Sequence, residues 1–381
     1  RQQYGIYLSP GANNNQIGGP GRGEGNLISG HRSDGVQVSS DSNYVCNNLI
    51  GVNRSGDSAL PNRYYGIDID GSHNRVGARA AGGNVISGNE VAGIYTNGDD
   101  KYNLIAGNYI GLDKSGTTAV ANGRGINIFN GANCDTIVGN VISGNSYAGI
   151  DIGTADSITV QSNYIGTNAA GDKAVPNGRD GIYIRNKSAH NLIGGPGAEY
   201  ANLISGNSRN ALYVSSGNSD SNRVEYNYIG TDVTGELPLP NQDNGVKIVN
   251  GACCNLVGPG NVIAFNENYG VYIRDNTTRY NRITANSIHS NASKGIYLAN
   301  GANQDIEAPV LTGIDPVTGT GPVGYLVEIF SDSTEQGRVF EDSVRVDESG
   351  TFTWNGTPAG PKITATLTSL SGSTSEFSDT L

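Results

Sequence analysis

Short apolar segments recur along this chain at a nearly constant interval. The phrase Gly-Ile-x-Ile, or a close variant, marks each repeat. Its first apolar residue recurs every 24 to 34 residues, at Ile6, Val36, Ile67, Ile94, Ile126, Ile150, Ile182, Leu212, Val246, Val271 and Ile296. Within each phrase the apolar residues alternate with others, as in a strand with one buried face. Repeats of about 20–50 residues are typical of solenoids, so the pattern predicts about eleven stacked coils.

Two further short strands, each introduced by Asn, lie between successive phrases, for example at 103–105 and 108–110. Three strands per coil, separated by Gly and Asn corners, predict an all-β fold: a right-handed, three-sided parallel β-helix over residues 1–304. A β-propeller is disfavoured because it needs four antiparallel strands per blade. We expect the corner asparagines to bond the backbone and the Asn of the next coil, which is a structural role.

A larger unit repeats on every second coil. Four matching loops occupy residues 50–62, 110–122, 165–177 and 229–241, and each carries an Asp or Asn three residues before a Gly, at Asn53, Asp113, Asn168 and Asp232. This spacing is typical of turns. A calcium site is the alternative, although each loop offers only one such side chain there.

The segments NVISGN (84–89 and 140–145) and NLISGN (202–207), together with the four loops, resemble secreted bacterial right-handed parallel β-helix repeat proteins over roughly residues 5–303. The resemblance implies the fold. It leaves the function open, because such helices serve as polysaccharide lyases, hydrolases, adhesins and structural surface proteins.

The repeat stops near Asn303, and residues 305–381 show alternating β-formers separated by turn residues, as in GYLVEIFSD (324–332). This pattern predicts a small antiparallel β-sandwich. It resembles the immunoglobulin-like modules of bacterial surface proteins, which implies spacing, anchoring or assembly.

Composition argues against several classes of function. The net charge of −11 argues against nucleic acid, and no apolar run is long enough for a membrane span. A chain that starts at Arg1 and has no Met is expected to be a processed, extracellular or cell-surface product. The four cysteines lack zinc-site spacing. They are expected to be small buried hydrophobes, with a disulfide from Cys134 to Cys253 or Cys254 as the alternative.

Candidate chemistry lies on the outward side of the Gly-Ile-x-Ile strands, where stacking about 4.8 Å apart forms columns of side chains. One column runs through Tyr7, Gln37, Asp68, Tyr95, Asn127, Asp151, Tyr183, Tyr213, Lys247, Tyr272 and Tyr297. Its neighbour includes Asp70, Asn97, Phe129, Arg185 and Arg274. The predicted binding face comprises Tyr95, Asn127, Tyr183, Arg185, Tyr213, Lys247, Tyr272 and Arg274.

Two catalytic sites are conceivable on this face. Glycoside hydrolysis needs a carboxylate pair, which could come from an acidic region formed by Asp68, Asp70, Asp99, Asp100 and Asp151. The GHG and RIK-like motifs of polygalacturonase-like hydrolases are absent. A lyase would instead use Lys247, Arg185 and Arg274, with calcium, but no acidic calcium cluster accompanies them. A solvated polar and aromatic face is the favoured interpretation, so no cofactor or metal is expected.

The first coil begins at once, with no capping helix before Gly5, and open β-helix ends normally need a cap. The sequence therefore predicts an extracellular structural or surface protein that binds copies of itself head to tail, as a filament. The alternative is a polysaccharide-active enzyme or a glycan-binding adhesin that uses the outer face.

Overall fold

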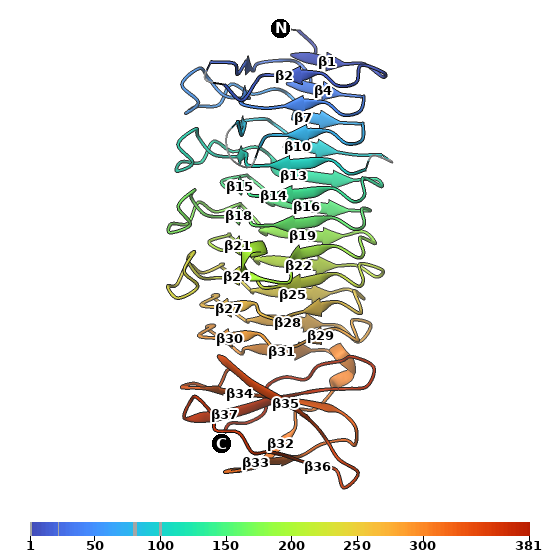
Figure 1. Cartoon of the computed structure of the whole chain (residues 1–381), viewed down its shortest axis with the longest axis vertical. Coiled ribbons are helices and arrows are strands. Elements are labelled where there is room, and N and C mark those ends of the chain that lie inside the picture. Colours follow the sequence, from blue (N-terminus) through green and yellow to red (C-terminus); the bar gives the residue numbers. More distant parts are fainter. Residues whose placement is uncertain (1, 22, 79–81, 99–100) are drawn as a thin grey trace.

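The computed structural model describes residues 2–21, 23–78, 82–98 and 101–381. They form a long rod of stacked coils with a small β-sandwich at its C-terminal end (Figure 1). In the described residues the rod has three parallel sheets of eleven, ten and ten strands, so the chain is a three-sided parallel β-helix followed by a sandwich.

The first sheet contains the Gly-Ile-x-Ile strands, which are β1 (Ile6–Leu8), β4 (Val36–Val38), β7 (Tyr65–Ile69), β10 (Ala92–Thr96), β13 (Arg124–Phe129), β16 (Ile150–Gly153), β19 (Ile182–Arg185), β22 (Leu212–Ser215), β25 (Val246–Val249), β28 (Val271–Arg274) and β31 (Ile296–Ala299). The second sheet contains β2 (Gln16–Ile17), β5 (Tyr44–Val45), β8 (Arg75–Val76), β11 (Leu104–Ala106), β14 (Thr136–Val138), β17 (Thr159–Gln161), β20 (Leu192–Gly194), β23 (Arg223–Glu225), β26 (Leu256–Val257) and β29 (Arg282–Ile283).

The third sheet contains β3 (Leu27–Ile28), β6 (Leu49–Ile50), β9 (Val85–Ile86), β12 (Tyr109–Ile110), β15 (Val141–Ile142), β18 (Tyr164–Ile165), β21 (Leu203–Ile204), β24 (Tyr228–Ile229), β27 (Val262–Ala264) and β30 (Ser287–His289). Two short 3-10 helices occur, η1 (Ala198–Tyr200) and η2 (Ala302–Asp305). The sandwich pairs β32 (Val310–Ile314), β33 (Val317–Thr320) and β36 (Thr351–Trp354) in one antiparallel sheet, and β35 (Val339–Arg345), β34 (Leu326–Asp332) and β37 (Lys362–Thr368) in the other.

The register of the first sheet confirms the predicted columns. Each first apolar residue pairs with its counterpart in the next coil, from Ile6 with Val36 to Val271 with Ile296. These residues point into the rod, where Ile67 and Ile126 are fully buried. The sandwich has a separate core around Val327, Phe352 and Trp354.

Three ladders of buried asparagines follow the corners of the rod. In one of them the Asn122 side chain donates to Asn145 Oδ1 at 3.0 Å, and Asn145 donates to Asn177 Oδ1 at 2.9 Å. The same side chains also bond backbone carbonyls of neighbouring coils, as Asn145 does with Ile110. The predicted structural role of the corner asparagines is confirmed. Each ladder side chain satisfies a buried backbone group that would otherwise be costly to leave unpaired.

The ladders run through Asn62, Asn89, Asn122, Asn145, Asn177, Asn207, Asn241, Asn266 and Asn291; through Asn26, Asn48, Asn84, Asn108, Asn140, Asn163, Asn202, Asn227, Asn261 and Asn286; and, with a break at the coil of Ile158, through Asn15, Asn43, Asn74, Asn103 and Asp135, then Asn191, Asn222, Asn255, Asn281 and Asn303.

The four matching loops project from one side of the rod (Figure 1). Their Asp or Asn residues close turns, as predicted: Asn53 Oδ1 accepts the Gly56 N–H at 2.9 Å. Although the loops lie on alternate coils, each contacts the next, because Lys114 N–H donates to Gly56 O at 2.9 Å and Ala169 N–H donates to Gly116 O at 2.8 Å. The loops therefore form one continuous ridge along the rod.

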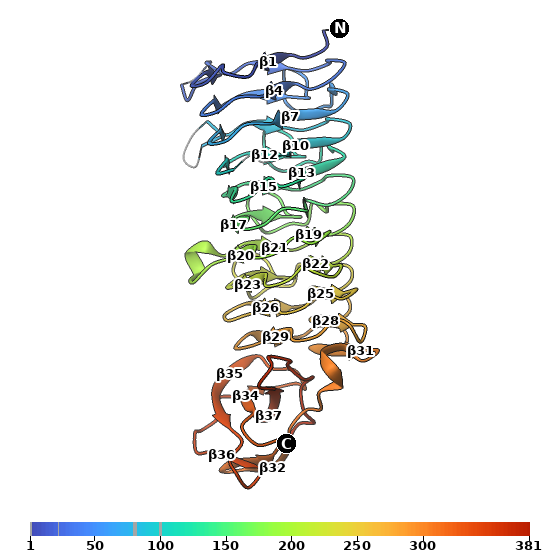
Figure 2. The same ribbon diagram turned by 90° about the vertical axis from the view of Figure 1, so that its right-hand side faces the viewer.

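The sandwich covers the end of the rod (Figure 2). The last strand of each sheet donates to it, with hydrogen bonds from Ile283 N–H to Thr374 Oγ1 (3.0 Å), from Ile288 N–H to Gly337 O (2.8 Å) and from Leu298 N–H to Glu376 Oε1 (2.9 Å). Unpaired strand edges invite association with other chains. The sandwich therefore acts as the C-terminal cap of the β-helix.

A side chain and a backbone carbonyl of the sandwich also continue two of the ladders. Gln336 Oε1 accepts from the Asn291 side chain at 3.1 Å, where the next coil would place an asparagine, and Thr374 O accepts from the Asn303 side chain at 2.9 Å. Near Asn286, where the remaining ladder ends, the buried Glu328 accepts from the Thr284 hydroxyl and from the Ala285 N–H.

The expectation of buried cysteines is met at Cys46 alone, and the alternative disulfide is not formed. Cys46 is buried, but Cys134 and Cys253 are half-buried and Cys254 is exposed, and all four are free. The predicted disulfide is wrong because Cys134 precedes β14 whereas Cys254 precedes β26, four strands further along the second sheet. Four strand spacings amount to about 19 Å, and bridged cysteines have α-carbons within about 7 Å.

Replacing a central ladder residue is expected to destabilise the rod. Asn145→Ala removes hydrogen bonds to Asn177 and Ile110 and leaves the Asn122 amide without its acceptor. The expected cost is about 3 kcal/mol, measured as a lower urea midpoint by circular dichroism. Asn276→Ala, at an exposed asparagine, is the control, and equal losses in both variants would contradict a structural ladder.

Glu328 should make the junction sensitive to pH. Burial raises the pKa of this carboxyl, against the opposing hydrogen bonds from Thr284 and Ala285. A carboxyl whose pKa is raised on folding contributes stability at low pH and loses it as the pH rises through the folded pKa. Glu328→Gln should therefore gain stability relative to the wild type as the pH rises from about 4 to 8, measured by thermal unfolding. Exposed Glu348→Gln is the control, and a pH-independent difference for Glu328→Gln would refute this assignment.

Candidate functional site

The outer face of the first sheet carries most of the predicted site residues. Its outward column pairs residue by residue from Tyr7 with Gln37 to Tyr272 with Tyr297. We call this column the outer face column. Adjacent members lie one strand spacing apart, about 4.8 Å, so each side chain packs against those above and below it.

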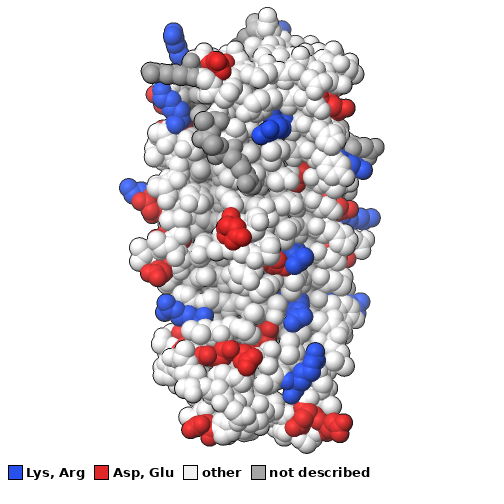
Figure 3. Space-filling model, in the orientation of Figure 1, with Lys and Arg blue, Asp and Glu red and all other residues white. Residues whose placement is uncertain are grey.

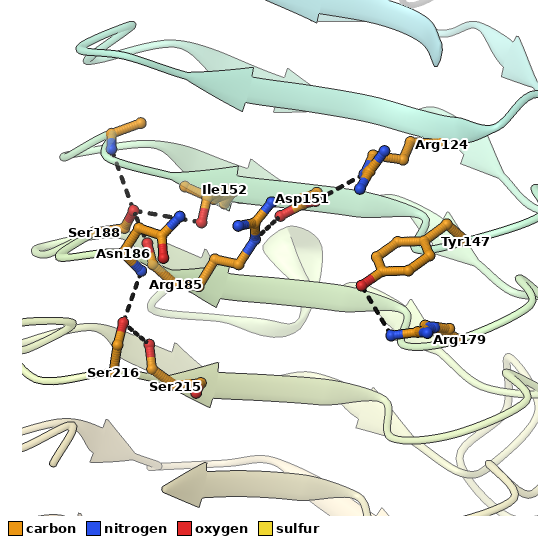
Figure 4. Close-up of polar contacts among 11 residues, drawn as sticks. Arg124, Tyr147, Asp151, Ile152, Arg179, Arg185, Asn186, Ser188, Ser215 and Ser216 are labelled. Carbon is orange, nitrogen blue, oxygen red and sulfur yellow. Dashed lines mark hydrogen bonds and ion pairs between the residues drawn. The ribbon is translucent and has the colours of Figure 1, made fainter. Parts of the chain in front are cut away.

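A buried carboxylate lies at the middle of the column. Asp151 is fully buried beneath two guanidinium groups (Figure 4). Arg124 Nε donates to Asp151 Oδ2 at 2.9 Å, while Arg185 Nε donates to Oδ1 at 2.9 Å and Arg185 Nη2 to Oδ2 at 3.1 Å. Both oxygens are occupied by charge-assisted bonds. Asp151 therefore positions the two arginines, and both of its oxygens are buried and hydrogen-bonded rather than open for proton transfer or nucleophilic attack.

Aromatic rings complete this cluster. Arg124 and Arg179 lie over the Tyr147 ring, 4.5 and 4.3 Å from its centroid, and Arg179 Nη1 donates to the Tyr147 hydroxyl at 2.9 Å. Arg185 lies 4.7 Å from the centroid of Phe129. Two guanidinium groups thus bond one carboxylate, a third bonds the Tyr147 hydroxyl, and each of the three also packs against an aromatic ring.

Alternation along the sequence does not reveal Arg124. Its backbone pairs with Ala92, which is fully buried, so strict alternation places position 124 inside the rod. Arg124 is the first residue of β13, and at this end of the strand its side chain turns outward to Asp151. Tyr147 and Arg179 lie before their strands, outside the Gly-Ile-x-Ile phrases, and only the count of aromatic and basic residues at these corners could have indicated them.

The C-terminal half of the column is a continuous stack. The Tyr183 and Tyr213 rings lie 4.8 Å apart and nearly parallel, at 3°. Lys247 Nζ lies between Tyr213 and Tyr272, 5.6 and 5.5 Å from their centroids, and Tyr272 stacks on Tyr297 at 5.7 Å. Stacking along the rod axis directs ring faces at one another and leaves edges and hydroxyls outward. Within this stack the ring faces are occupied by other side chains of the protein.

The N-terminal half contains the remaining acidic candidates. Asp68 is buried in the column between Gln37 and Tyr95. Asp70 accepts amide hydrogen bonds from Gln37 at 2.7 Å and Asn97 at 2.5 Å. Asp99 and Asp100 lie outside the described residues. Asn127 lies one strand from Asp151.

Two tyrosines on this face, Tyr65 and Tyr183, have raised pKa values. Tyr95 stacks on Tyr65 at 4.5 Å. Burial and the neighbouring Tyr95 raise the pKa of Tyr65 to about 12, and burial and the neighbouring Tyr213 raise the pKa of Tyr183. These hydroxyls stay protonated at neutral pH.

The predicted catalytic groups are not brought together as sets. Asp68 and Asp151 lie on β7 and β16, three strands apart, or about 14 Å, beyond the about 9.5 Å that inverting glycosidases use. Arg185 and Arg274 are also three strands apart, and Lys247 lies on β25 between them. Arg274 pairs with Asp275 at 3.3 Å. Asp68 and Asp70, on one strand and the residue after it, are the remaining close carboxylates.

On the face drawn in Figure 3, basic and acidic side chains are interspersed over a largely uncharged surface. Within residues 2–21, 23–78, 82–98 and 101–381, no three His, Cys, Asp or Glu side chains are grouped as metal ligands. In the same ranges no helix has the length and apolar character needed to cross a membrane.

No protein-family model matches this sequence, and no curated protein matches it either. Among solved structures, a mutant of the periplasmic alginate epimerase AlgG shares 14% identity and a TM-score of 0.44, over 69% of this chain and 63% of that one. This chain therefore spans less than two thirds of the length of that epimerase.

Two other structures are similar in the same way. The Dettilon tailspike protein gp208 shares 15% identity, a TM-score of 0.35, and 90% and 68% of the two chains. PfbA, a surface adhesin of Streptococcus pneumoniae, shares 10% identity, a TM-score of 0.33, and 93% and 78% of the two chains. At these TM-scores the similarities assign no activity.

Removing the charge of Asp151 is expected to destabilise the rod. Asp151→Asn would leave Arg124 and Arg185 facing each other without their shared carboxylate, at an expected cost of about 2–3 kcal/mol. The control is Asp243→Asn, because Asp243 is half-exposed and lies 3.7 Å from Lys247, and its loss should cost less than about 1 kcal/mol. Urea unfolding measures both, and a neutral Asp151→Asn would show that the cluster is not structural.

Proposed function

We propose that this chain is a non-catalytic extracellular or cell-surface structural protein, a rigid rod that holds its C-terminal sandwich at a fixed distance. The observation that carries the proposal is that the polar and aromatic groups of the outer face already contact one another. Its central carboxylate, Asp151, is hydrogen-bonded to Arg124 and Arg185. The faces of its tyrosine rings contact neighbouring rings and Lys247.

Rigidity follows from the same contacts. Three asparagine ladders tie each coil to the next, and the isoleucine core is continuous along the rod. A rod of this kind transmits position and force along its axis, because each coil contacts only its neighbours and the ladders are bonded in series. This suits a spacer more than a flexible tether.

Head-to-tail assembly into a filament stays a prediction. The sandwich already occupies the edges of β29, β30 and β31. A second copy would therefore have to contact the far side of the sandwich with its first coil, or use another surface.

The alternative is a polysaccharide-active enzyme with Asp68 and a second carboxylate, for which Asp99 and Asp100 lie outside the described residues and Asp70 is the candidate within them. Two residues along a strand separate their α-carbons by about 7 Å and direct both side chains to the same face, and inverting glycosidases hold their two carboxyl groups about 6.5–9.5 Å apart. However, both Asp70 oxygens accept amide hydrogen bonds, and Asp68 is buried. A general acid needs a protonated oxygen directed at the leaving group, so this pair is the weaker candidate.

Turnover measurements separate the two functions. The full chain would be incubated with pectin, alginate, xylan, cellulose and chitin, and assayed for new reducing ends and for the unsaturated uronates that lyases release. We expect no product above that of the Asp68→Asn/Asp70→Asn double variant. Turnover that this double variant loses would establish the enzyme and overturn the structural proposal.

A further inference from the structure

The junction between rod and sandwich contains an open hollow that meets the outer face column only at its last residue, Tyr297. Its volume is about 1320 Å³, larger than the about 300–1,000 Å³ of ordinary small-molecule sites. The rod contributes Tyr269 and residues 293–297, and the sandwich contributes residues 333–336, Lys362 and residues 376–380. We call this hollow the junction groove. Ligand sites are frequent where two domains meet.

The walls of the junction groove are fixed by direct bonds. The Gln336 side chain donates to the carbonyls of Asn291 and Ser293, both at 2.9 Å. Lys294 Nζ lies 2.5 Å from Glu376 Oε2, and the other carboxyl oxygen of Glu376 accepts the Leu298 N–H at 2.9 Å. The groove therefore keeps its shape without a ligand, which lowers the entropy cost of binding.

An aromatic pair forms part of the wall on the rod. Tyr269 lies outside the outer face column and stacks on Tyr297 at 4.5 Å, next to Tyr272 at 5.4 Å. Tyr269 and Tyr297 both line the groove. Burial and the neighbouring Tyr297 and Tyr272 raise the pKa of Tyr269, so its hydroxyl remains a hydrogen-bond donor at neutral pH. Tyrosine combines a large apolar surface with this polar tip.

The opposite wall is polar, and its charges nearly cancel. Lys362 Nζ lies 4.0 Å from Glu335 Oε1, with 44% and 80% of the two side chains exposed, so this pair is loose and its groups are open to a ligand. Asp379 also lines the groove, with Lys294 and Glu376. Two lysines and three carboxylates disfavour a strongly charged ligand and offer many donors and acceptors.

From this geometry we propose that the junction groove binds an uncharged oligosaccharide. Tyr269, which lies outside the outer face column, would pack against the apolar side of a sugar ring, and Tyr297, whose faces contact Tyr269 and Tyr272, would contribute its outward edge and hydroxyl. Glu335, Lys362 and Asp379 would bond the hydroxyls, which both donate and accept. The volume favours a chain of several sugars over one. The inference builds on the proposed function, to which it adds a ligand: the rod would hold a glycan-binding junction, with no chemistry performed on the glycan.

Titration calorimetry of the full chain with cellohexaose, xylohexaose, mannohexaose, maltohexaose and chitohexaose tests the proposal. At least one is expected to bind, and Tyr269→Ala and Glu335→Gln should each weaken that binding about ten-fold or more. Tyr64→Ala removes an exposed tyrosine near the other end of the rod and should leave the affinity unchanged. Thermal unfolding of each variant confirms that the junction is intact.

Two results would overturn the proposal: no binding of any of the five sugars, or binding that neither junction variant weakens. The turnover assay is independent of this experiment. If the chain binds a hexasaccharide in the groove and also degrades a polysaccharide, the proposed structural function is wrong and the proposed binding site is retained. If the chain neither binds nor degrades a sugar, the proposed structural function is retained and the proposed binding site is wrong.

Discussion

The hydrogen bond from one corner asparagine to the next is the interaction on which the rest of this structure depends. The ladder amides are buried beyond the first members Asn15 and Asn26, as at Asn122 and Asn145, and a buried amide needs partners for its carbonyl and its NH₂. Those partners are supplied by the coil above and the coil below. A single coil therefore cannot satisfy its own corners, and stability arises only when coils stack. The same requirement explains the end of the rod, where Gln336 takes the place of the next asparagine.

Stacking also limits what the surface can do. A spacing of about 4.8 Å brings each outward side chain against two like neighbours, where repeated charges of one sign would repel. The column avoids this by placing Lys247 between two tyrosines and two arginines around Asp151. These contacts stabilise the register of the coils. They also use the ring faces and carboxylate oxygens that a ligand or a reaction would need.

The repeat could be predicted from the sequence because its signals are local. Alternation assigns Ile126 and Ile150 to the inside, and equal phrases then place them in the same column. The four loops could be predicted in the same way, from Asn53 and its Gly three residues later. Contacts that break the period could not. Arg124 turns outward at a strand end, and the Cys134 disulfide fails because equivalent corners can be several coils apart.

The junction was beyond prediction for a further reason. Gln336 and Glu376 lie in a sandwich whose sequence carries no trace of the coil period, yet both bond the last coils. Their partners are fixed only by how two separately folded parts meet. No further coil packs against the outer face here. Tyr269 and Tyr297 stack on each other at the last two coils, and Glu335 and Lys362 contact each other rather than a neighbouring coil. A rod whose repeated face is closed by its own packing can offer polar and aromatic groups to a ligand where the repeat ends.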